Sequence, residues 1–419
     1  MEKLTIIMTT DKNYIMPTKV AIYTMLKYSS DDVAFDIHIL CETTFDMISR
    51  QYLKKMEEQC SRISFFFDEI DISEIKNAKT HSYIPLASYY RLYISRFIKE
   101  DKCLFIDGDV IVRCNLKELF NIDIEDYYIA AVRDCAVQTG KKDFVNHEYE
   151  LGIPSLDNYV NAGVMIFNLD RIRRDALDTS FIQAIGAGYR FMDQDILNKF
   201  CYGHVKIIPL KYNLFSEYYD RVYKMPENLY TREELEEAQR YPAIIHYPGP
   251  FKPWTCSRLK ANKLWWKEAE EILTQQELQE WKNKARSFEQ ESDFSYLIGN
   301  LGEYEKIVIF GFSDIGKQLL DMLMERLPQK QFYFCDNDET KQGKQYREIL
   351  VFSVNQIIDQ EENFYWIIGS QNAYVPIKNQ LLSFGVEDRK ITRYLHKDSS
   401  YYDRLDDEFK EYEEAMIRG

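Results

Sequence analysis

Short apolar runs alternate with helix-favouring segments along most of the chain, and this alternation constrains the fold more than any other feature. Strands are predicted over residues 3–10, 35–42, 62–70 and 102–112, and helices over residues 17–29, 47–60 and 87–98. Pro17 suits the first turn of the first helix. Strands separated by helices of about 10 to 15 residues indicate βαβ units and a parallel sheet with helices on both faces. Ligands of such sheets bind beyond the carboxyl ends of the strands.

The same pattern begins a second time toward the C-terminus. Strand, glycine turn, helix and strand recur in KIVIFGFSDIGKQLLDML, QFYFCDND and FYWIIGSQN (residues 306–323, 331–338 and 364–372). A charged, helix-favouring segment from about Leu259 to Gln290 separates the two patterns. We therefore expect two α/β domains, residues 1–275 and 301–396, joined by a helical connector, 276–300, and followed by an acidic tail, 397–419.

The composition limits the classes of partner that the chain can bind and the cellular compartment in which we expect it. A formal net charge of −15 argues against a general nucleic-acid binder, because such binding needs clustered Lys and Arg. The eight cysteines form no C-x-x-C pair, which suits reduced thiols better than a disulfide framework or a zinc site. No run approaches about 18 uninterrupted apolar residues, and the first residues lack the apolar core of a signal peptide. We therefore expect a cytoplasmic protein.

One segment leaves a membrane contact open. In RLKANKLWWK (residues 258–267) basic residues flank Trp265 and Trp266, a mixture that could lie on the inner face of a membrane and reach a lipid-linked acceptor. The alternative, which we favour, is a helix that packs its tryptophans on the first domain, since acidic residues follow at once.

The stretch CLFIDGDVIV (residues 103–112) places two carboxylates one residue apart in an apolar run. Burying such a pair costs several kcal/mol unless a cation balances it. On an extended strand Asp107 and Asp109 would face the same side, and Gly108 would let a ligand approach the backbone. Two hard oxygen ligands suit Mg²⁺ or Mn²⁺, ions that also hold diphosphates. The alternative is a β-hairpin with Asp-Gly at its turn.

The motif AIIHYPGPFKPW (residues 243–254) favours the metal site. A strand is predicted to end at His246, and a loop that carries Lys252 and Trp254 follows. An imidazole can complete a metal site with two carboxylates, and a lysine can hold phosphate oxygens as a point charge. A purely structural histidine is the alternative.

Six motifs together resemble those of the family 8 retaining glycosyltransferases, which include glycogenin and bacterial lipopolysaccharide galactosyl- and glucosyltransferases. They occur in the family's order and are TTDKNY (9–14), SYYRL (88–92), FIDGDVIV (105–112), NAGVMIFNL (161–169), DQDILN (193–198) and HYPGPFKPW (246–254). The resemblance covers roughly residues 3–275. It implies an α/β fold of the GT-A type, a mixed sheet that binds a nucleotide sugar, to which a smaller Rossmann-like α/β domain is appended.

The resemblance also implies a role for each matching residue. The implied ligands of Mn²⁺ (or Mg²⁺) are Asp107, Asp109 and His246. The implied binding residues for a UDP-sugar are Thr9, Thr10, Asp11, Asn13, Tyr14, Arg91, Gly108, Asn161, Ala162, Asp193, Gln194, Gly249, Lys252 and Trp254. Within this set the segment from Thr9 to Tyr14 would hold the uridine, and the loop with Lys252 would close on the diphosphate.

Structural alternatives exist for three of these positions. Arg91 could be a surface cation on an amphipathic helix. Asn161, with Gly163, could simply make a turn that leads into a buried strand. Asp193 could merely cap the helix that begins there.

The implied reaction transfers glucose or galactose from UDP to a hydroxyl of a glycan, glycolipid or glycoprotein, with retention at the anomeric carbon. The position beneath that carbon corresponds to Gln194, and an amide is a poor nucleophile. Asp193, Asp195 and Asp134 are alternative nucleophiles. We favour attack on the same face through a short-lived oxocarbenium-like species, with Arg91 and Lys252 at the diphosphate.

The second domain carries a nucleotide-binding signature that is incomplete. In VIFGFSDIGK the first and third glycines are Gly311 and Gly316, while Ser313 replaces the middle one. Asp336, 20 residues after Gly316, stands where a ribose-binding acid is expected. Similar appended modules occur in bacterial polysaccharide-assembly proteins, so a ligand-binding domain and a degenerate scaffold that docks a partner or a second copy are both open.

Two rival functions follow from these features. The chain could be a nucleotide-sugar dehydrogenase or epimerase that uses the second domain, but the Tyr-Lys or Cys signature and the complete glycine motif are missing. It could also be a catalytically weak, sugar-nucleotide-binding scaffold in polysaccharide assembly, against which the intact set Asp107, Asp109, His246 and Lys252 argues.

Overall fold

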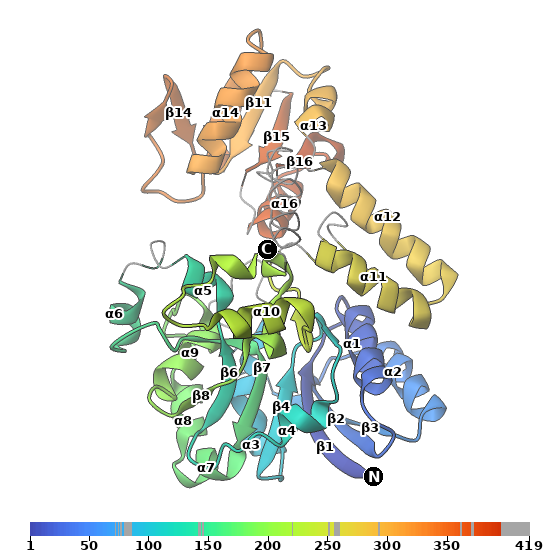
Figure 1. Ribbon diagram of the computed structural model, residues 1–419. Coiled ribbons are helices and arrows are strands. Elements are labelled where there is room, and N and C mark those ends of the chain that lie inside the picture. The colour runs from blue at the N-terminus through green and yellow to red at the C-terminus, as the bar shows by residue number, and fades with distance from the viewer. Residues whose placement is uncertain are drawn as a thin grey trace, which may run out of the picture. The chain divides into compact units, whose positions relative to one another are not determined.

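The computed structural model describes residues 1–71, 73, 75, 78, 86–140, 144, 146–219, 221–249, 252–254, 260–291, 294–360, 363–369 and 373–394. These fall into two compact units (Figure 1). The first comprises Met1–Thr80, Ile84–Pro253 and Leu259–Leu278, and the second comprises His81–Tyr83, Trp254–Arg258 and Gln279–Gly419. The predicted acidic tail, 397–419, lies outside the described residues.

A seven-stranded sheet forms the centre of the first unit, in the order β3-β2-β1-β4-β7-β6-β8. Its strands are β1 (Glu2–Thr9), β2 (Val33–Glu42), β3 (Ile63–Ile70), β4 (Lys102–Ile106), β6 (Ile129–Arg133), β7 (Val160–Asn168) and β8 (Val205–Ile207). Strands β3, β2, β1 and β4 are parallel, as the alternation predicts, whereas β7 runs antiparallel to both β4 and β6. The sheet is therefore mixed, as the family resemblance implies, and the parallel arrangement that the alternation alone indicates holds for β3, β2, β1 and β4.

Helices and 3₁₀ turns surround this sheet. They are α1 (Ile15–Tyr28), α2 (Met47–Gln59), η2 (Leu86–Tyr93), α3 (Ile94–Phe97), α4 (Leu116–Phe120), α5 (Cys135–Thr139), α6 (His147–Leu151), α7 (Leu169–Arg174), α8 (Leu177–Gln183), α9 (Met192–Phe200), η4 (Leu210–Asn213), η5 (Ser216–Tyr218), η6 (Val222–Lys224), α10 (Arg232–Arg240) and α11 (Lys260–Ile272). Helix α12 (Gln275–Glu291) continues from the first unit into the second. The helix predicted over residues 87–98 is instead a 3₁₀ segment followed by one α-helical turn.

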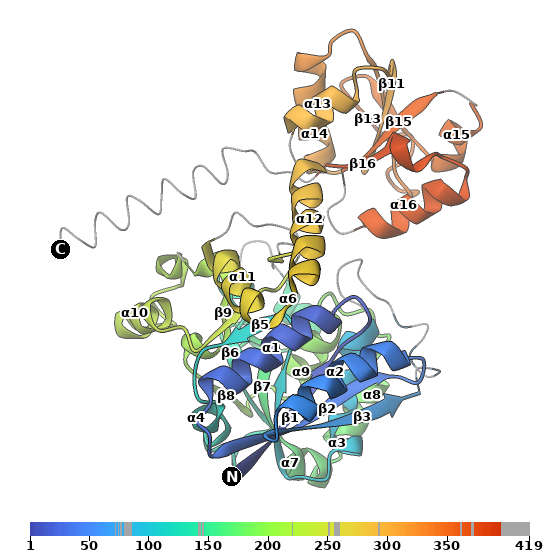
Figure 2. The same ribbon diagram turned by 90° about the vertical axis from the view of Figure 1, so that its right-hand side faces the viewer.

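Each face of the large sheet has its own apolar core, because successive side chains of a strand point to opposite faces. Leu4, Ile6 and Met8 of β1 belong to a core that α1 and α2 cover, and these helices lie side by side in Figure 2. Ile7 belongs to the core on the other face, which η2, α3, α7, α8 and α9 cover. With both faces covered, the carboxyl ends of the parallel strands are left as the natural place for a ligand.

The run predicted as one strand over residues 102–112 is divided at its acidic triplet. Strand β4 ends at Ile106, and the chain resumes as β5 (Val110–Val112) in a separate three-stranded sheet of order β5-β10-β9. The partners there are β9 (Leu214–Phe215) and β10 (Ile244–His246). Because β4 and β5 lie in different sheets, the Asp-Gly hairpin is wrong as well.

The second unit is a six-stranded sheet of order β13-β14-β12-β11-β15-β16 with helices on both faces. Its elements are β11 (Lys306–Phe310), β12 (Gln331–Cys335), β13 (Gln345–Tyr346), β14 (Ile349–Phe352), β15 (Phe364–Ile368), β16 (Ile391–Arg393), α13 (Phe294–Asn300), α14 (Asp314–Arg326), α15 (Val354–Ile358), α16 (Tyr374–Ser383) and η7 (Asp388–Lys390). Except for β13, neighbouring strands are parallel. The order, with its reversal between β11 and β15, is that of doubly wound sheets.

The two tryptophans of the basic segment are internal to the first unit. Trp265 is fully buried on α11, and the indole of Trp266 donates to the Pro253 carbonyl over 2.9 Å. This is the arrangement that the packing interpretation predicts. Among the residues that the structure describes, no helix combines the length and the hydropathy needed to cross a membrane.

Gly316 provides a test of the second unit. A Cβ at this position would lie 2.1 Å from the Gly311 carbonyl oxygen, where β11 turns into α14. We expect Gly316→Ala to lower the free energy of unfolding of this unit by about 1–3 kcal/mol, since backbone must move to admit a methyl group. Hydrogen exchange of the β11 amides in urea measures this locally. Gly299→Ala, whose Cβ meets nothing within 4 Å, is the matched control and should not lower stability.

Candidate functional site

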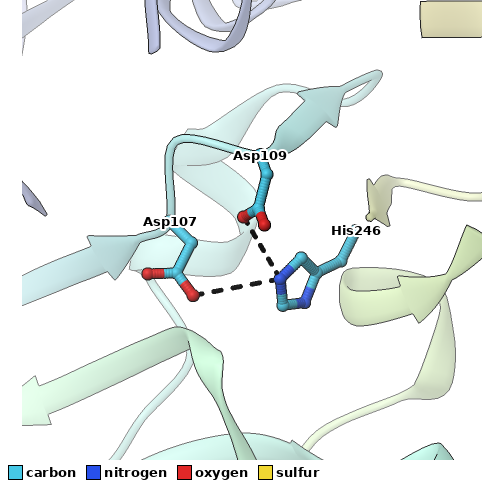
Figure 3. A group of neighbouring side chains, drawn as sticks. All are labelled: Asp107, Asp109 and His246. Carbon is cyan, nitrogen blue, oxygen red and sulfur yellow. Dashed lines mark ion pairs between the residues drawn. The ribbon is translucent and has the colours of Figure 1, made fainter. Parts of the chain in front are cut away.

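Three potential metal ligands converge where β4 and β10 end (Figure 3). His246 Nε2 lies 3.3 Å from Asp109 Oδ1 and 3.9 Å from Asp107 Oδ2. One ligand atom from each of the three residues fits within 4.8 Å of the others. Two carboxylates and one imidazole form a donor set that divalent cations such as Mn²⁺ accept, so the residues present fit the implied ion.

Backbone hydrogen bonds fix the positions of these ligands. The Asp107 N–H donates to the Gly163 carbonyl of β7 over 2.8 Å, and the Tyr247 N–H donates to the Asp109 carbonyl over 2.9 Å. Strand β10 pairs antiparallel with β5, which places His246 opposite Val110. The triplet thus leaves the large sheet and enters the small one while both of its carboxylates face the imidazole.

Gly163 leaves room for the histidine ring. A Cβ at this position would lie 2.2 Å from His246 Cε1 and 2.8 Å from its Nδ1. Asn161 and Gly163 both lie within β7, so the interpretation that they form a turn is wrong. The glycine is needed for packing against an imidazole that comes from 83 residues further along the chain, as the numbering shows.

Arg91 is buried at the centre of the site. Its Nη2 bonds Asp107 Oδ1 over 3.1 Å, its Nε lies 2.9 Å from Asp193 Oδ2, and its Nη1 donates to the Ala162 carbonyl. The guanidinium also stacks over the Phe105 ring at 4.3 Å. The surface-cation alternative is therefore wrong, and Arg91 ties η2, the acidic triplet, β7 and α9 together.

Asp193 is likewise a buried partner rather than a helix cap. The N-cap of α9 is Phe191, and Asp193 lies in the first turn with its carboxylate on Arg91. Burial raises the pKa of Asp193 to about 6, and the guanidinium of Arg91 opposes that rise.

Lys252 supplies a second cation to the acidic pair. Its Nζ bonds Asp109 Oδ2 and the Tyr247 carbonyl, and it lies 5.8 Å from the centre of the Tyr14 ring. Burial disfavours the charge on Asp109, but Lys252 and His246 outweigh it and hold the pKa of Asp109 well below its usual value. For Asp107, burial dominates and raises the pKa despite Arg91. Lys252 thus pairs with the oxygen of Asp109 that does not face His246.

Gln194 has its amide fully engaged. Its Oε1 accepts from Asn161 Nδ2 and from the Ala162 N–H, each over 3.0 Å. Its Nε2 donates to Asp134 Oδ2 over 3.1 Å and to the Tyr159 hydroxyl over 3.3 Å. Both lone pairs and both hydrogens are therefore in use.

The other two candidate nucleophiles, Asp195 and Asp134, are also engaged in hydrogen bonds. Asp195 is fully buried, and it accepts from His147 Nε2 over 2.9 Å, from the Tyr159 hydroxyl and from the Phe191 N–H. Asp134 is buried, and its carboxylate accepts from the side-chain amides of Asn161 and Gln194. It also accepts from the Val137 N–H, and so caps α5.

The segment from Thr9 to Tyr14 connects β1 to α1 beside the acidic triplet. Asp11 Oδ1 accepts from the backbone N–H groups of Asn13 and Tyr14, so this carboxylate shapes the loop. Thr10 bonds Thr18 of α1 over 2.9 Å. A Cβ on Gly108 would come within 2.5 Å of that Thr18 hydroxyl, so helix α1 already accounts for the glycine. Its predicted contact with a ribose stays a prediction.

Gly249 and Trp254 follow His246 in the chain. Gly249 has a φ of +69°, a left-handed conformation that favours glycine whether or not a ligand is present. The Trp254 ring packs edge-on against Trp281 at 6.1 Å. Pro250 and Phe251 lie outside the described residues, and the predicted role of this loop at a diphosphate stays a prediction.

Several residues of the network carry no sequence signal that identified them. They are Thr18, His147, Tyr159 and Asn213. Asn213 ends η4 in LKYN and accepts from His246 Nδ1 over 2.9 Å. Only the fold brings these residues to the site. Gly163 lies inside a matched motif, but the sequence indicated only a turn at that position.

In the second unit, side chains in and beside the glycine turn bond to the turn's own backbone N–H groups. Ser313 caps α14 through the Gly316 N–H, and Asp336 accepts from the Phe312 N–H over 2.8 Å and from Lys341 over 3.1 Å. The acid expected to bind a ribose is thus already paired within the turn and with a lysine.

Comparison with known proteins agrees with this geometry. The model of the family described as glycosyl transferase family 8 matches residues 5–257, and that described as C2185-like, N-terminal, matches residues 303–392. The chain is 24% identical to glycosyltransferase GlyF of Streptococcus pneumoniae serotype 4 over 394 residues, 92% of this chain and 88% of that protein. It is 27% identical to a lipopolysaccharide 1,2-glucosyltransferase of Escherichia coli over 256 residues, 58% of this chain and 71% of that protein.

Among solved structures, the galactosyltransferase LgtC, in complex with donor and acceptor sugar analogues, superimposes with a TM-score of 0.55. The identity is 22%, and the match covers 67% of this chain and 100% of that one. This likeness bears on the fold, and it confirms the predicted GT-A type.

Gly163→Ala tests how the site is assembled. The methyl group would displace the His246 ring, so we expect the affinity for Mn²⁺ to fall about 10–100-fold. Isothermal titration with Mn²⁺ in the absence of nucleotide measures this. Val164→Ala, on the same buried strand, is the matched control: it should destabilise the fold and leave the affinity unchanged. Wild-type affinity in Gly163→Ala would contradict the packing described above.

Proposed function

This chain belongs to glycosyl transferase family 8, and we propose that its donor is a UDP-hexose, glucose or galactose, held through a divalent cation. One observation carries the proposal: Asp107, Asp109 and His246, from the middle and the end of the first unit, converge with Lys252 beside them. The names of the relatives support the hexose, since one is a glucosyltransferase and another a galactosyltransferase.

The cation would be held by Asp107, Asp109 and His246, and when bound it would act as a Lewis acid on the leaving diphosphate. Lys252, which bonds Asp109 Oδ2 and the Tyr247 carbonyl, would contribute its ammonium to the phosphate oxygens, where it would stabilise the charge that develops as UDP departs. Arg91, already bonded to Asp107, Asp193 and Ala162, would keep these segments in place around the sugar.

Retention is best explained by attack on the same face. The bond from the anomeric carbon to the β-phosphate oxygen breaks with its electron pair on the phosphate. The acceptor oxygen then bonds that carbon from the side of the departing UDP, and its proton passes to the phosphate oxygen. A double displacement would need a free carboxylate beneath the sugar. Supporting the single-face route, Gln194 and the nearby aspartates are engaged in hydrogen bonds or ion pairs.

For the second unit we favour a scaffold or docking role over nucleotide binding. The pairing of Asp336 within its own turn supports this choice, and it also weakens the rival dehydrogenase or epimerase function. The acceptor, a glycan, glycolipid or glycoprotein hydroxyl, and a location in the cytoplasm or at the inner face of a membrane complete the proposal.

Asp109→Asn tests the proposed function. Loss of one ligand charge should reduce UDP release from UDP-glucose or UDP-galactose in Mn²⁺ by about a hundredfold or more, with the fold intact. Slow hydrolysis without an acceptor suffices to measure this. Asp36→Asn, which removes an exposed pair with Lys3, is the matched control and should leave turnover unchanged. Near wild-type turnover in Asp109→Asn would refute the metal-held donor.

Same-face attack makes a separate prediction. During turnover with UDP-glucose or UDP-galactose, intact-mass spectrometry of the quenched enzyme should find no hexosyl adduct on the protein. A hexosyl group mapped to Asp134, Asp193, Asp195 or Gln194 would establish a double displacement instead.

A further inference from the structure

A line of buried amides joins Asp134 to the ring of His246, and we infer that Asn213 is a positioning residue that fixes which ring nitrogen carries the proton. The members in order are Asp134, Asn161, Asn213 and His246. This inference rests on the proposed function, because it concerns how His246 is prepared as a metal ligand.

The direction of the first amide is fixed by groups that can act in only one way. Asp134, as a carboxylate, only accepts, so the Asn161 group 3.1 Å from it must be the NH₂. The Gly163 backbone N–H only donates, so the Asn161 atom 2.9 Å from it must be the oxygen. A flipped Asn161 would lose both bonds and set like groups against each other.

The orientation of the second amide, that of Asn213, follows from the orientation of the first. With its oxygen toward Asn213, Asn161 requires a donor there, and Asn213 Nδ2 lies 2.9 Å away. The oxygen of Asn213 therefore faces His246 Nδ1, at 2.9 Å. A neutral imidazole that donates from Nδ1 keeps its lone pair on Nε2. That nitrogen is the one that faces Asp107 and Asp109.

Burial of these four residues makes the orientation of each amide energetically important. Asn213 is 0% exposed, His246 3%, Asp134 5% and Asn161 8%. Because water has little access to these groups, a wrong orientation would leave buried polar atoms unsatisfied, at a cost of about 1–3 kcal/mol each. The Phe215 ring closes the remaining side of the imidazole, edge-on at 5.5 Å.

The line also links the metal ligands to the sugar-binding residues. The second hydrogen of Asn161 Nδ2 bonds Gln194 Oε1, whose own direction is fixed by the Ala162 N–H. Asp134 accepts from both amides. One anion thus orients the residue proposed beneath the anomeric carbon and, through Asn161 and Asn213, the proposed metal ligand.

The test begins with the metal-free, nucleotide-free protein. In ¹⁵N-histidine-labelled full-length chain, at a pH where the ring is neutral and with His246 assigned from His246→Gln, we expect the proton on Nδ1, opposite Asn213 Oδ1. Asn213→Leu should give a mixture of forms and weaken Mn²⁺ binding about 10–100-fold by isothermal titration. Asn168→Leu, a buried asparagine at the other end of β7, is the control and should change neither measurement.

Asn213→Asp separates orientation from packing. An aspartate keeps an acceptor opposite Nδ1 but places an oxygen against the Asn161 oxygen. We expect it to be less stable than the wild type and yet to retain the Nδ1–H form and bind Mn²⁺ more tightly than Asn213→Leu does. A purely structural role predicts that Asn213→Asp binds no better than Asn213→Leu. That result, an Nε2–H form in the wild type, or wild-type Mn²⁺ affinity in Asn213→Leu would each overturn the inference. Failure of UDP-hexose turnover would leave the tautomer measurement unaffected.

Discussion

The placement of two carboxylates at the end of β4, Asp107 half-buried and Asp109 buried, is the constraint on which the rest of the first unit depends. Two neighbouring carboxylates withdrawn from water repel each other and lose their hydration, so cations must accompany them. The fold provides Arg91 for Asp107 and Lys252 for Asp109. These cations come from η2 and from the loop after β10, so the charges at the end of β4 bring distant segments of the chain together.

The charge balance of the cluster suits the proposed chemistry. Asp107, Asp109 and Asp193 face the fixed cations Arg91 and Lys252, and the ring of His246 lies against both Asp107 and Asp109. In their ionised forms the carboxylates exceed the fixed cations by one, which favours an added cation. A diphosphate would then compensate the surplus positive charge.

Much of the fold was open to prediction because it follows from local pattern. Short apolar runs identified β1 and β2, and the strand–turn–helix pattern of residues 306–323 identified β11 and α14. The errors fall where long-range contacts override local preference. The apolar run over residues 102–112 looks continuous, but Asp107 bonds β7 while β5 pairs with β10. Asn161 and Gly163 resemble turn residues, yet both lie inside β7.

By itself, the sequence determined the residue types of the site: two carboxylates, an imidazole and a lysine in motifs that point to a nucleotide sugar. It also determined the alternation that sends strand ends to one edge of a sheet. Only the tertiary structure decided how these groups are used, for example that Arg91 is an internal tie and that Gly163 makes room for His246. The reason is physical. A hydrogen bond or a van der Waals contact depends on positions a few Å apart in space, and residues such as Asn213 and His246, 33 positions apart in the chain, meet only after the sheets have formed.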